Sequence, residues 1–145
     1  MDDKTILVDT SAWIEAFKGR LSLEKKTILQ NAIESERAVT SPLIILELLQ
    51  GCRTLKEKTK LRNLMTSLRQ LDLNSVLWDK TYELGFILRR KGLTIATVDL
   101  ILATLAIHYD CSILHKVEIP EVSDSDSGEV SDTIPINFRT LVLVS

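Results

Sequence analysis

Three acidic residues stand inside or directly beside apolar segments, where an ionised side chain is rare unless it has a partner. Asp9 follows the short apolar run Ile6–Val8. Glu47 lies within the stretch "PLIILELLQG", and Asp99 begins the segment "DLILATLAI". Carboxylates that lie close together repel one another, and a divalent cation between them removes the repulsion. Oxygen ligands without His or Cys favour Mg²⁺ or Mn²⁺ over zinc, so the three acids predict such a site.

Carboxylates that share a hard dication are used to hydrolyse phosphodiester bonds. We therefore predict that Asp9, Glu47 and Asp99 are both the catalytic and the metal-binding residues. Taken singly, each has a structural explanation. Asp9 could cap a helix, Glu47 could reach solvent or a lysine, and Asp99 could stabilise the first turn of a helix. Thr97 could cap that helix or orient the Asp99 carboxylate.

Short strands and helices alternate along the sequence and must bring these acids together. Segment 6–8 reads as a buried parallel strand, and segments 38–40 and 111–114 read as short strands. Ser41 as N-cap, Pro42 at the first helical position and Gly51 past the end predict a helix around Glu47. Further helices are expected at 10–17, 21–37, 54–71, 77–92 and 97–110, and further strands at 72–76 and 139–144. The alternation predicts an α/β fold around a mostly parallel sheet, with Asp9 at the edge where such folds bind ligands.

The composition is that of an ordinary folded domain. The 145 residues are 45% hydrophobic and 26% charged, and we expect residues 1–145 to form one domain. The net charge of −2 does not indicate a nucleic-acid binder, although a basic face is compatible with it. With no secretory signal, Cys52 and Cys111 are expected to be reduced thiols of a cytoplasmic protein. The apolar stretches are too short to cross a membrane.

The sequence resembles the PIN-domain ribonucleases, and most closely the VapC-type toxins of type II toxin–antitoxin systems. The segments "ILVDTSAWIEAF", "TSPLIILELLQG" and "RRKGLTIATVDLILATLAIHYDCSILH" carry the resemblance, which spans about residues 5–115. It implies a PIN-like three-layer α/β/α sandwich and Mg²⁺-dependent endonucleolytic cleavage of RNA. It also implies a homodimer and a small cognate antitoxin. By position, Asp9, Glu47 and Asp99 match acidic metal-site residues of the family, and Ser11 and Thr97 match supporting polar residues.

The sequence departs from the family after the last matching strand. Many family members continue with L-L-H-x-D-x-D-F, whose first Asp is a fourth acid, whereas this chain has "ILHKVEIP". Val117 stands at the expected Asp, and Glu118 lies one residue further on. Glu118, Asp124 or Asp126 could supply the missing carboxylate, or the site could have three acids. The segment at about 118–135 contains "SDSDSG" and is predicted to be an acidic loop or insertion.

Two other functions remain open. A PIN domain that lost catalysis with its fourth acid would act as an RNA-binding or protein-interaction module. A receiver-type phosphoacceptor domain would also cluster acids, but it would leave Glu47 without a role. The basic run Arg89–Arg90–Lys91 could bind substrate phosphates or simply stabilise a helix end. His108 and His115 lack partners at metal-binding spacing, so neither is expected to be a metal ligand or a general base.

Overall fold

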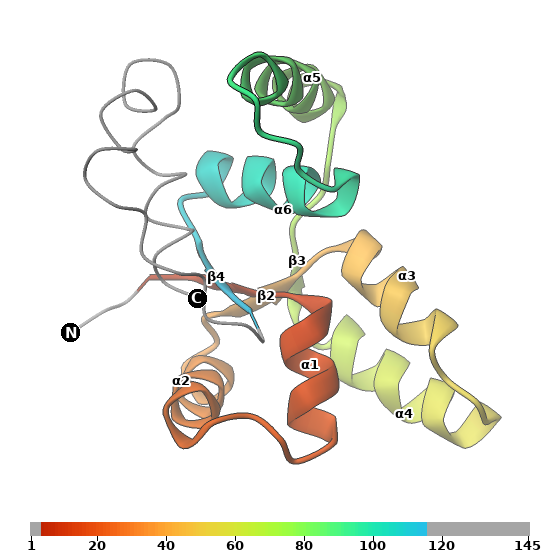
Figure 1. Ribbon diagram of the computed structural model, residues 1–145. Helices are drawn as coiled ribbons and strands as arrows, with labels where there is room; N and C mark the ends of the chain where they lie inside the picture. Colours follow the sequence, from red (N-terminus) through yellow and green to blue (C-terminus); the bar gives the residue numbers. More distant parts are fainter. Residues whose placement is uncertain (1–3, 116–145) are drawn as a thin grey trace. The chain divides into compact units, whose positions relative to one another are not determined.

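A computed structural model describes residues 4–115 of the chain (Figure 1). Val117, Glu118, the acidic segment at about 118–135 and the strand predicted at 139–144 lie outside the described residues. The described residues divide into two compact units. The first contains residues 4–72 and 113–115, and the second contains Leu73–Ser112. The prediction of one domain over residues 1–145 stays a prediction.

The first unit is built on a sheet of short strands in the order β3-β2-β1-β4. The strands are β1 (Ile6–Val8), β2 (Ala38–Thr40), β3 (Arg69–Gln70) and β4 (Ser112–Leu114). Both β1 and β3 pair with β2 in parallel, with Ile6 opposite Ala38 and Val39 opposite Arg69. All residues of β1 and β2 are buried, as expected for inner strands of a parallel sheet. The predicted α/β class with a parallel sheet is confirmed.

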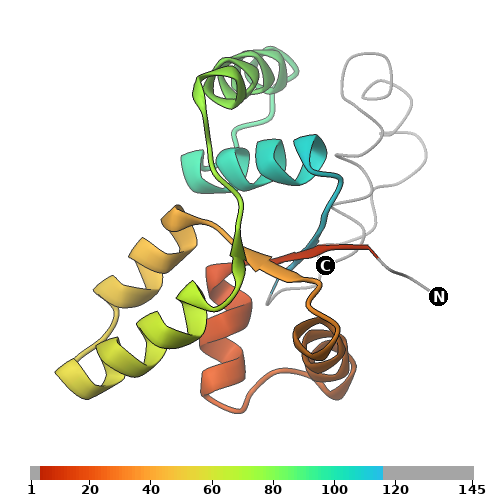
Figure 2. The same cartoon turned by 180° about the vertical axis from the view of Figure 1, so that it is seen from behind.

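Four helices belong to the first unit. They are α1 (Thr10–Phe17), α2 (Leu23–Glu34), α3 (Pro42–Gln50) and α4 (Leu55–Thr66). The cap residues expected from the sequence begin and end α3: the Ser41 hydroxyl accepts from the Ile44 N–H, Pro42 occupies the first turn, and Gly51 is the C-cap. Helices α3 and α4 lie side by side, as both views show (Figure 2). Glu47 is thus carried by a helix whose ends are set by local sequence signals.

The expected helix at 54–71 and the expected strand at 72–76 are wrong in their bounds. Helix α4 already ends at Thr66, and residues 69–70 form β3. The Leu71 N–H donates a 2.8 Å hydrogen bond to the Thr40 carbonyl, and the Leu71 side chain is buried. Within this stretch, Leu61 and Leu64 lie on α4, whereas Leu71 directly follows β3. Sheet pairing with β2 overrides the local helical pattern.

The second unit is a pair of helices, α5 (Ser75–Arg90) and α6 (Thr97–His108). Leu84, Leu88 and Ala103 form its buried core. Gly85 allows the helices to approach closely, because a Cβ there would lie 2.8 Å from Cδ2 of Leu100. Gly92 follows α5 with a φ of 81°, which ends the helix in a conformation that favours glycine.

Two remaining expectations concern cysteines and membranes. Within residues 4–115, neither Cys52 nor Cys111 takes part in a disulfide. Among the helices of residues 4–115, none combines the length and the apolar character needed to cross a bilayer.

Candidate active site

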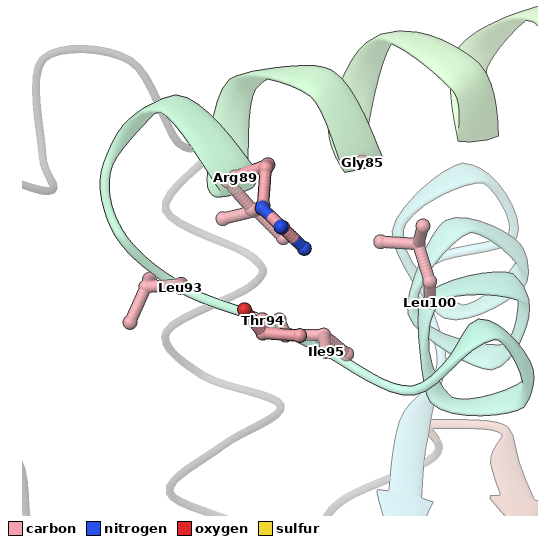
Figure 3. Close-up of a pocket in the computed structure, with 7 residues that line it drawn as sticks. Gly85, Arg89, Leu93, Thr94, Ile95 and Leu100 are labelled. Carbon is pink, nitrogen blue, oxygen red and sulfur yellow. The ribbon is translucent and has the colours of Figure 1, made fainter.

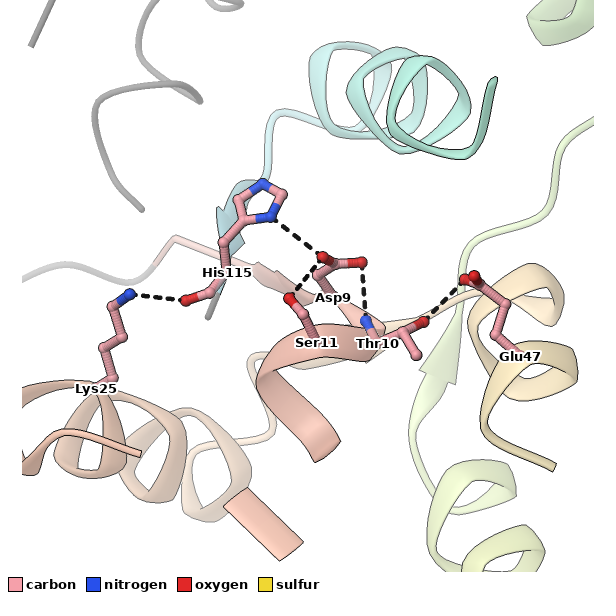
Figure 4. Close-up of polar contacts among 6 residues, drawn as sticks. All are labelled: Asp9, Thr10, Ser11, Lys25, Glu47 and His115. Atoms are coloured by element: carbon pink, nitrogen blue, oxygen red, sulfur yellow. Dashed lines mark hydrogen bonds and ion pairs between the residues drawn. The ribbon is translucent and has the colours of Figure 1, made fainter. Parts of the chain in front are cut away.

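Asp9 lies where the first strand passes into the first helix. Its N–H donates a 3.0 Å hydrogen bond to the Leu114 carbonyl of β4, and its carboxylate caps α1 by accepting from the Thr10 N–H at 2.8 Å. The Ser11 hydroxyl donates to Oδ2 of Asp9 at 2.9 Å (Figure 4). Asp9 is only 8% exposed. The capping role and the predicted position at the edge of the sheet are therefore both observed, and Ser11 supports Asp9 as expected.

Glu47 is half-buried on α3, and its partner is a hydroxyl group. Oγ1 of Thr10 donates a 2.9 Å hydrogen bond to Oε1 of Glu47 (Figure 4). Thr10 thus binds one acid through its backbone N–H and the other through its side chain. Asp9 and Glu47 are therefore linked through Thr10 at one end of the sheet, and their role as metal ligands stays a prediction. The structure also adds Thr10, which the sequence analysis did not assign to the site.

His115 is the second site residue that the sequence analysis missed. Its Nδ1 lies 3.1 Å from Oδ2 of Asp9, as Figure 4 shows. His115 directly follows β4, and β4 is the neighbour of β1 in the sheet. Residues after adjacent parallel strands meet at the same edge, so its place after a strand was the available signal. His115 therefore contacts an acid of the site, and the expectation that it is neither a metal ligand nor a general base stays a prediction.

The environment of Asp9 keeps its carboxylate ionised. Burial raises the pKa of Asp9, but hydrogen bonds from His115 and Ser11, the electrostatic attraction of His115 and the Thr10 N–H outweigh this effect, so that the pKa lies below its ordinary value. An ionised carboxylate only accepts hydrogen bonds. The proton between Asp9 and His115 therefore resides on Nδ1 of the imidazole.

Asp99 and Thr97 lie on α6, in the second unit. Asp99 is exposed in the first turn of that helix, where the helix dipole favours an anion. Thr97 is the first helical residue, and the N-cap is Ala96, which makes no side-chain cap bond. The capping role considered for Thr97 is therefore wrong. The convergence of Asp99 with Asp9 and Glu47 stays a prediction.

The two acids of the first unit suit part of a Mg²⁺ site. Mg²⁺ is commonly held by one or two carboxylates together with waters and substrate phosphates. Asp9 is ionised, and its neighbour Glu47 supplies a second carboxylate. Within the described part of this unit, no three His, Cys, Asp or Glu side chains are grouped closely enough to hold a metal ion. The donor chemistry thus fits a hard dication, with two of the three predicted ligands together.

The second unit carries a small pocket of about 240 Å³ between α5, the following loop and α6 (Figure 3). Its walls are mostly aliphatic, from Leu88, Leu93, Ile95 and Leu100, with Arg89 and Thr94 as polar lining residues. The guanidinium of the next residue, Arg90, lies 5.5 Å from the centre of the Phe86 ring. The basic run predicted to bind substrate is therefore an exposed helix end, with Arg89 beside an apolar pocket.

Asp9 stands at the end of a buried parallel strand and is linked through Thr10 to Glu47 of α3. These features define an α/β protein with an acidic site at its sheet edge. The family model described as PIN domain matches residues 6–116. The chain belongs to the PIN domain family.

The relatives found by sequence confirm the predicted resemblance to VapC-type proteins. The chain is 31% identical over 117 residues to the VapC ribonuclease Mb1587 of Mycobacterium bovis, covering 77% of this chain and 85% of the relative. The same figures hold for the ribonuclease VapC11 of Mycobacterium tuberculosis.

Solved structures of low sequence identity support the fold. VapBC2 of Rickettsia felis, bound to a DNA fragment of its promoter, matches with a TM-score of 0.63 and 19% identity over 75% of this chain and 84% of that one. DNA-bound VapBC of Salmonella typhimurium matches with a TM-score of 0.58 and 20% identity, over 71% and 79% of the two chains. At 19% and 20% identity, these two similarities are evidence for a shared fold and not for a shared function.

Proposed function

We propose that this protein is a metal-dependent endoribonuclease and the toxin of a toxin–antitoxin pair, acting in the cytoplasm. The observation that carries the proposal is the junction at Thr10, which holds the carboxylates of Asp9 and Glu47 at one end of the parallel sheet. The relatives named as ribonucleases, at 31% identity, support the same activity.

Asp9, Glu47 and Asp99 are the proposed catalytic and metal-binding residues, with Mg²⁺ or Mn²⁺ as the cofactor. Such a dication supplies Lewis-acid chemistry, which stabilises charge on the scissile phosphate and makes water a better nucleophile. Asp9 contributes a carboxylate that is ionised at neutral pH without any prior proton transfer. Ser11 and Thr10 hold that carboxylate in one orientation, and Thr10 also orients Glu47. Glu118 remains an additional candidate ligand.

We place RNA contacts at the C-terminal end of α5. Arg89, Arg90 and Lys91 bring three positive charges to this helix end. Arg89 makes no ion pair within residues 4–115, so its guanidinium is available for a phosphate or for the face of a base. The aliphatic pocket beside it suits an unstacked base, since bases of single-stranded RNA bind by stacking and apolar contact.

The partners that we propose are a cognate antitoxin and a second copy of this chain. The two structural neighbours are complexes named VapBC, which supports a protein partner for this chain as well.

A catalytically impaired PIN domain is the second candidate function. Val117 favours it, because the family resemblance implies an acid at that position. Such a protein would bind RNA or another protein without cleaving RNA. Cleavage that requires Mg²⁺ or Mn²⁺ and stops with EDTA would exclude it.

The test of the proposed function is cleavage of a mixed RNA pool by the purified protein with Mg²⁺, with Mn²⁺ and with EDTA. Asp9→Asn and Glu47→Gln should each slow cleavage about a hundredfold or more, which corresponds to about 3 kcal/mol of activation free energy. Glu34→Gln is the matched control, because it neutralises an exposed acid on α2. Wild-type-like cleavage by Asp9→Asn would refute the proposed catalytic site.

A further inference from the structure

The hydrogen bonds around Asp9 leave one of its oxygens less occupied than the other. A carboxylate offers about four lone-pair positions, two on each oxygen. Oδ2 accepts from the Ser11 hydroxyl at 2.9 Å and faces Nδ1 of His115 at 3.1 Å. Among the described residues, Oδ1 accepts only from the Thr10 N–H, at 2.8 Å. The remaining acceptor position of Asp9 is therefore on Oδ1, the oxygen held by the residue that also binds Glu47.

His115 is itself held in place from the opposite direction. The Nζ of Lys25 donates a 2.8 Å hydrogen bond to the backbone carbonyl of His115 (Figure 4). Lys25 is buried although it carries a charge, and this contact joins α2 to the residue that follows β4. The strand and the lysine together fix the backbone of His115, so its ring meets Asp9 from a defined side.

We infer that His115 is a positioning residue of the proposed metal site, and that its Nδ1–H holds Asp9 with Oδ1 as the oxygen that would bind a dication. The inference rests on the proposed function. Imidazole and carboxylate partners of metal ligands fix the orientation of those ligands in many metal sites. His115 lies two positions before Val117, and Val117 stands where the family pattern has its fourth acid.

Two substitutions separate positioning from general packing. In His115→Asn the side-chain amide nitrogen can occupy the place of Nδ1 and donate to Asp9. In His115→Gln the amide nitrogen lies near the place of Nε2, so the donor to Asp9 is displaced. Both variants remove the aromatic ring and both carry a neutral amide. If His115 acted only in packing, the two variants would have the same Mn²⁺ affinity. If His115 positions Asp9, His115→Asn should keep an affinity close to that of the wild type and His115→Gln should not.

The first measurement is Mn²⁺ binding to the full-length protein, by titration calorimetry or by electron paramagnetic resonance of the free ion. We expect His115→Gln and His115→Ala to weaken Mn²⁺ affinity about 10- to 100-fold, and His115→Asn to stay within about threefold of wild type. Wild-type affinity in His115→Gln and His115→Ala would overturn the inference. A wild-type protein that binds neither Mn²⁺ nor Mg²⁺ would instead overturn the proposed metal site on which the inference rests.

The second measurement is the thermal midpoint of unfolding in EDTA, in a double-mutant cycle with Asp9→Asn. If His115 acts through Asp9, His115→Gln should lower the midpoint more in the otherwise wild-type protein than in the Asp9→Asn variant. His115→Asn should show a smaller difference between these two backgrounds. Equal shifts in both backgrounds would show that the two side chains act independently, and would overturn the inference whatever the metal affinity.

Discussion

The hydroxyl of Thr10 donates a 2.9 Å hydrogen bond to Oε1 of Glu47, 37 residues further along the chain. The backbone N–H of the same threonine donates to Asp9 at 2.8 Å. Thr10 is the first residue of α1 and Glu47 lies in the middle of α3, so the contact links two helices as well as two acids. Thr10 therefore contacts both carboxylates that the proposed metal site would use.

Removing the Thr10 hydroxyl should weaken both the fold and the site. Thr10→Val keeps the shape of the side chain and the N–H bond to Asp9, but it leaves half-buried Glu47 without its donor. We expect the free energy of unfolding to fall by about 1 to 2 kcal/mol, measured by urea denaturation, together with a loss of RNA cleavage. Thr10→Ser keeps the hydroxyl and is the control. Equal stability and cleavage for the valine and serine variants would contradict the role of this bond.

Asp9 should make the stability of the metal-free protein depend on pH in the acidic range. The folded-state pKa of Asp9 is lowered, so its contribution is fully present above the unfolded value of about 3.9 and is lost as the pH falls through the lower folded value. In EDTA, the free energy of unfolding of the wild type should therefore fall relative to that of Asp9→Asn as the pH is lowered below about 5. A shift in favour of the wild type over that range would contradict the lowered pKa.

Asp99→Asn should separate catalysis from folding. Asp99 is exposed in the first turn of α6, and a neutral asparagine there loses only a dipole interaction of about 0.3 to 1 kcal/mol. We expect a nearly unchanged circular dichroism melt and a loss of cleavage comparable to that of Asp9→Asn. Full cleavage by purified Asp99→Asn would remove Asp99 from the proposed metal site and leave Asp9 and Glu47 in it.

Arg89→Ala should weaken RNA binding without affecting the acids. Binding of a single-stranded RNA to the Asp9→Asn background should lose about three- to tenfold in affinity, and the slope of log K against log salt should fall by about one. Lys26→Ala on α2 is the control, because it removes an exposed positive charge elsewhere. The measurement is fluorescence anisotropy at several salt concentrations. An unchanged salt slope in Arg89→Ala would argue against a phosphate contact at this residue.

The sequence alone determined the features whose signals are local. The burial of Ile6–Val8, the position of Asp9 at the start of α1 and the ends of α3 all follow from a few neighbouring residues. Capping hydrogen bonds and the preference of Pro and Gly for helix ends act within one turn, so they can be read directly from the chain. The acids Asp9 and Glu47 were identified in the same way, because each lies beside apolar neighbours.

Tertiary structure alone decided which distant residues touch those acids. Thr10 as the partner of Glu47, His115 as the partner of Asp9 and Lys25 as the support of His115 depend on which strands and helices become neighbours. The short strand β3 likewise formed where the local pattern favoured a helix, because residues 69–71 pair with β2. Hydrogen bonds between segments far apart in the chain have no local sequence signal, since their partners are chosen by the order of the strands in the sheet.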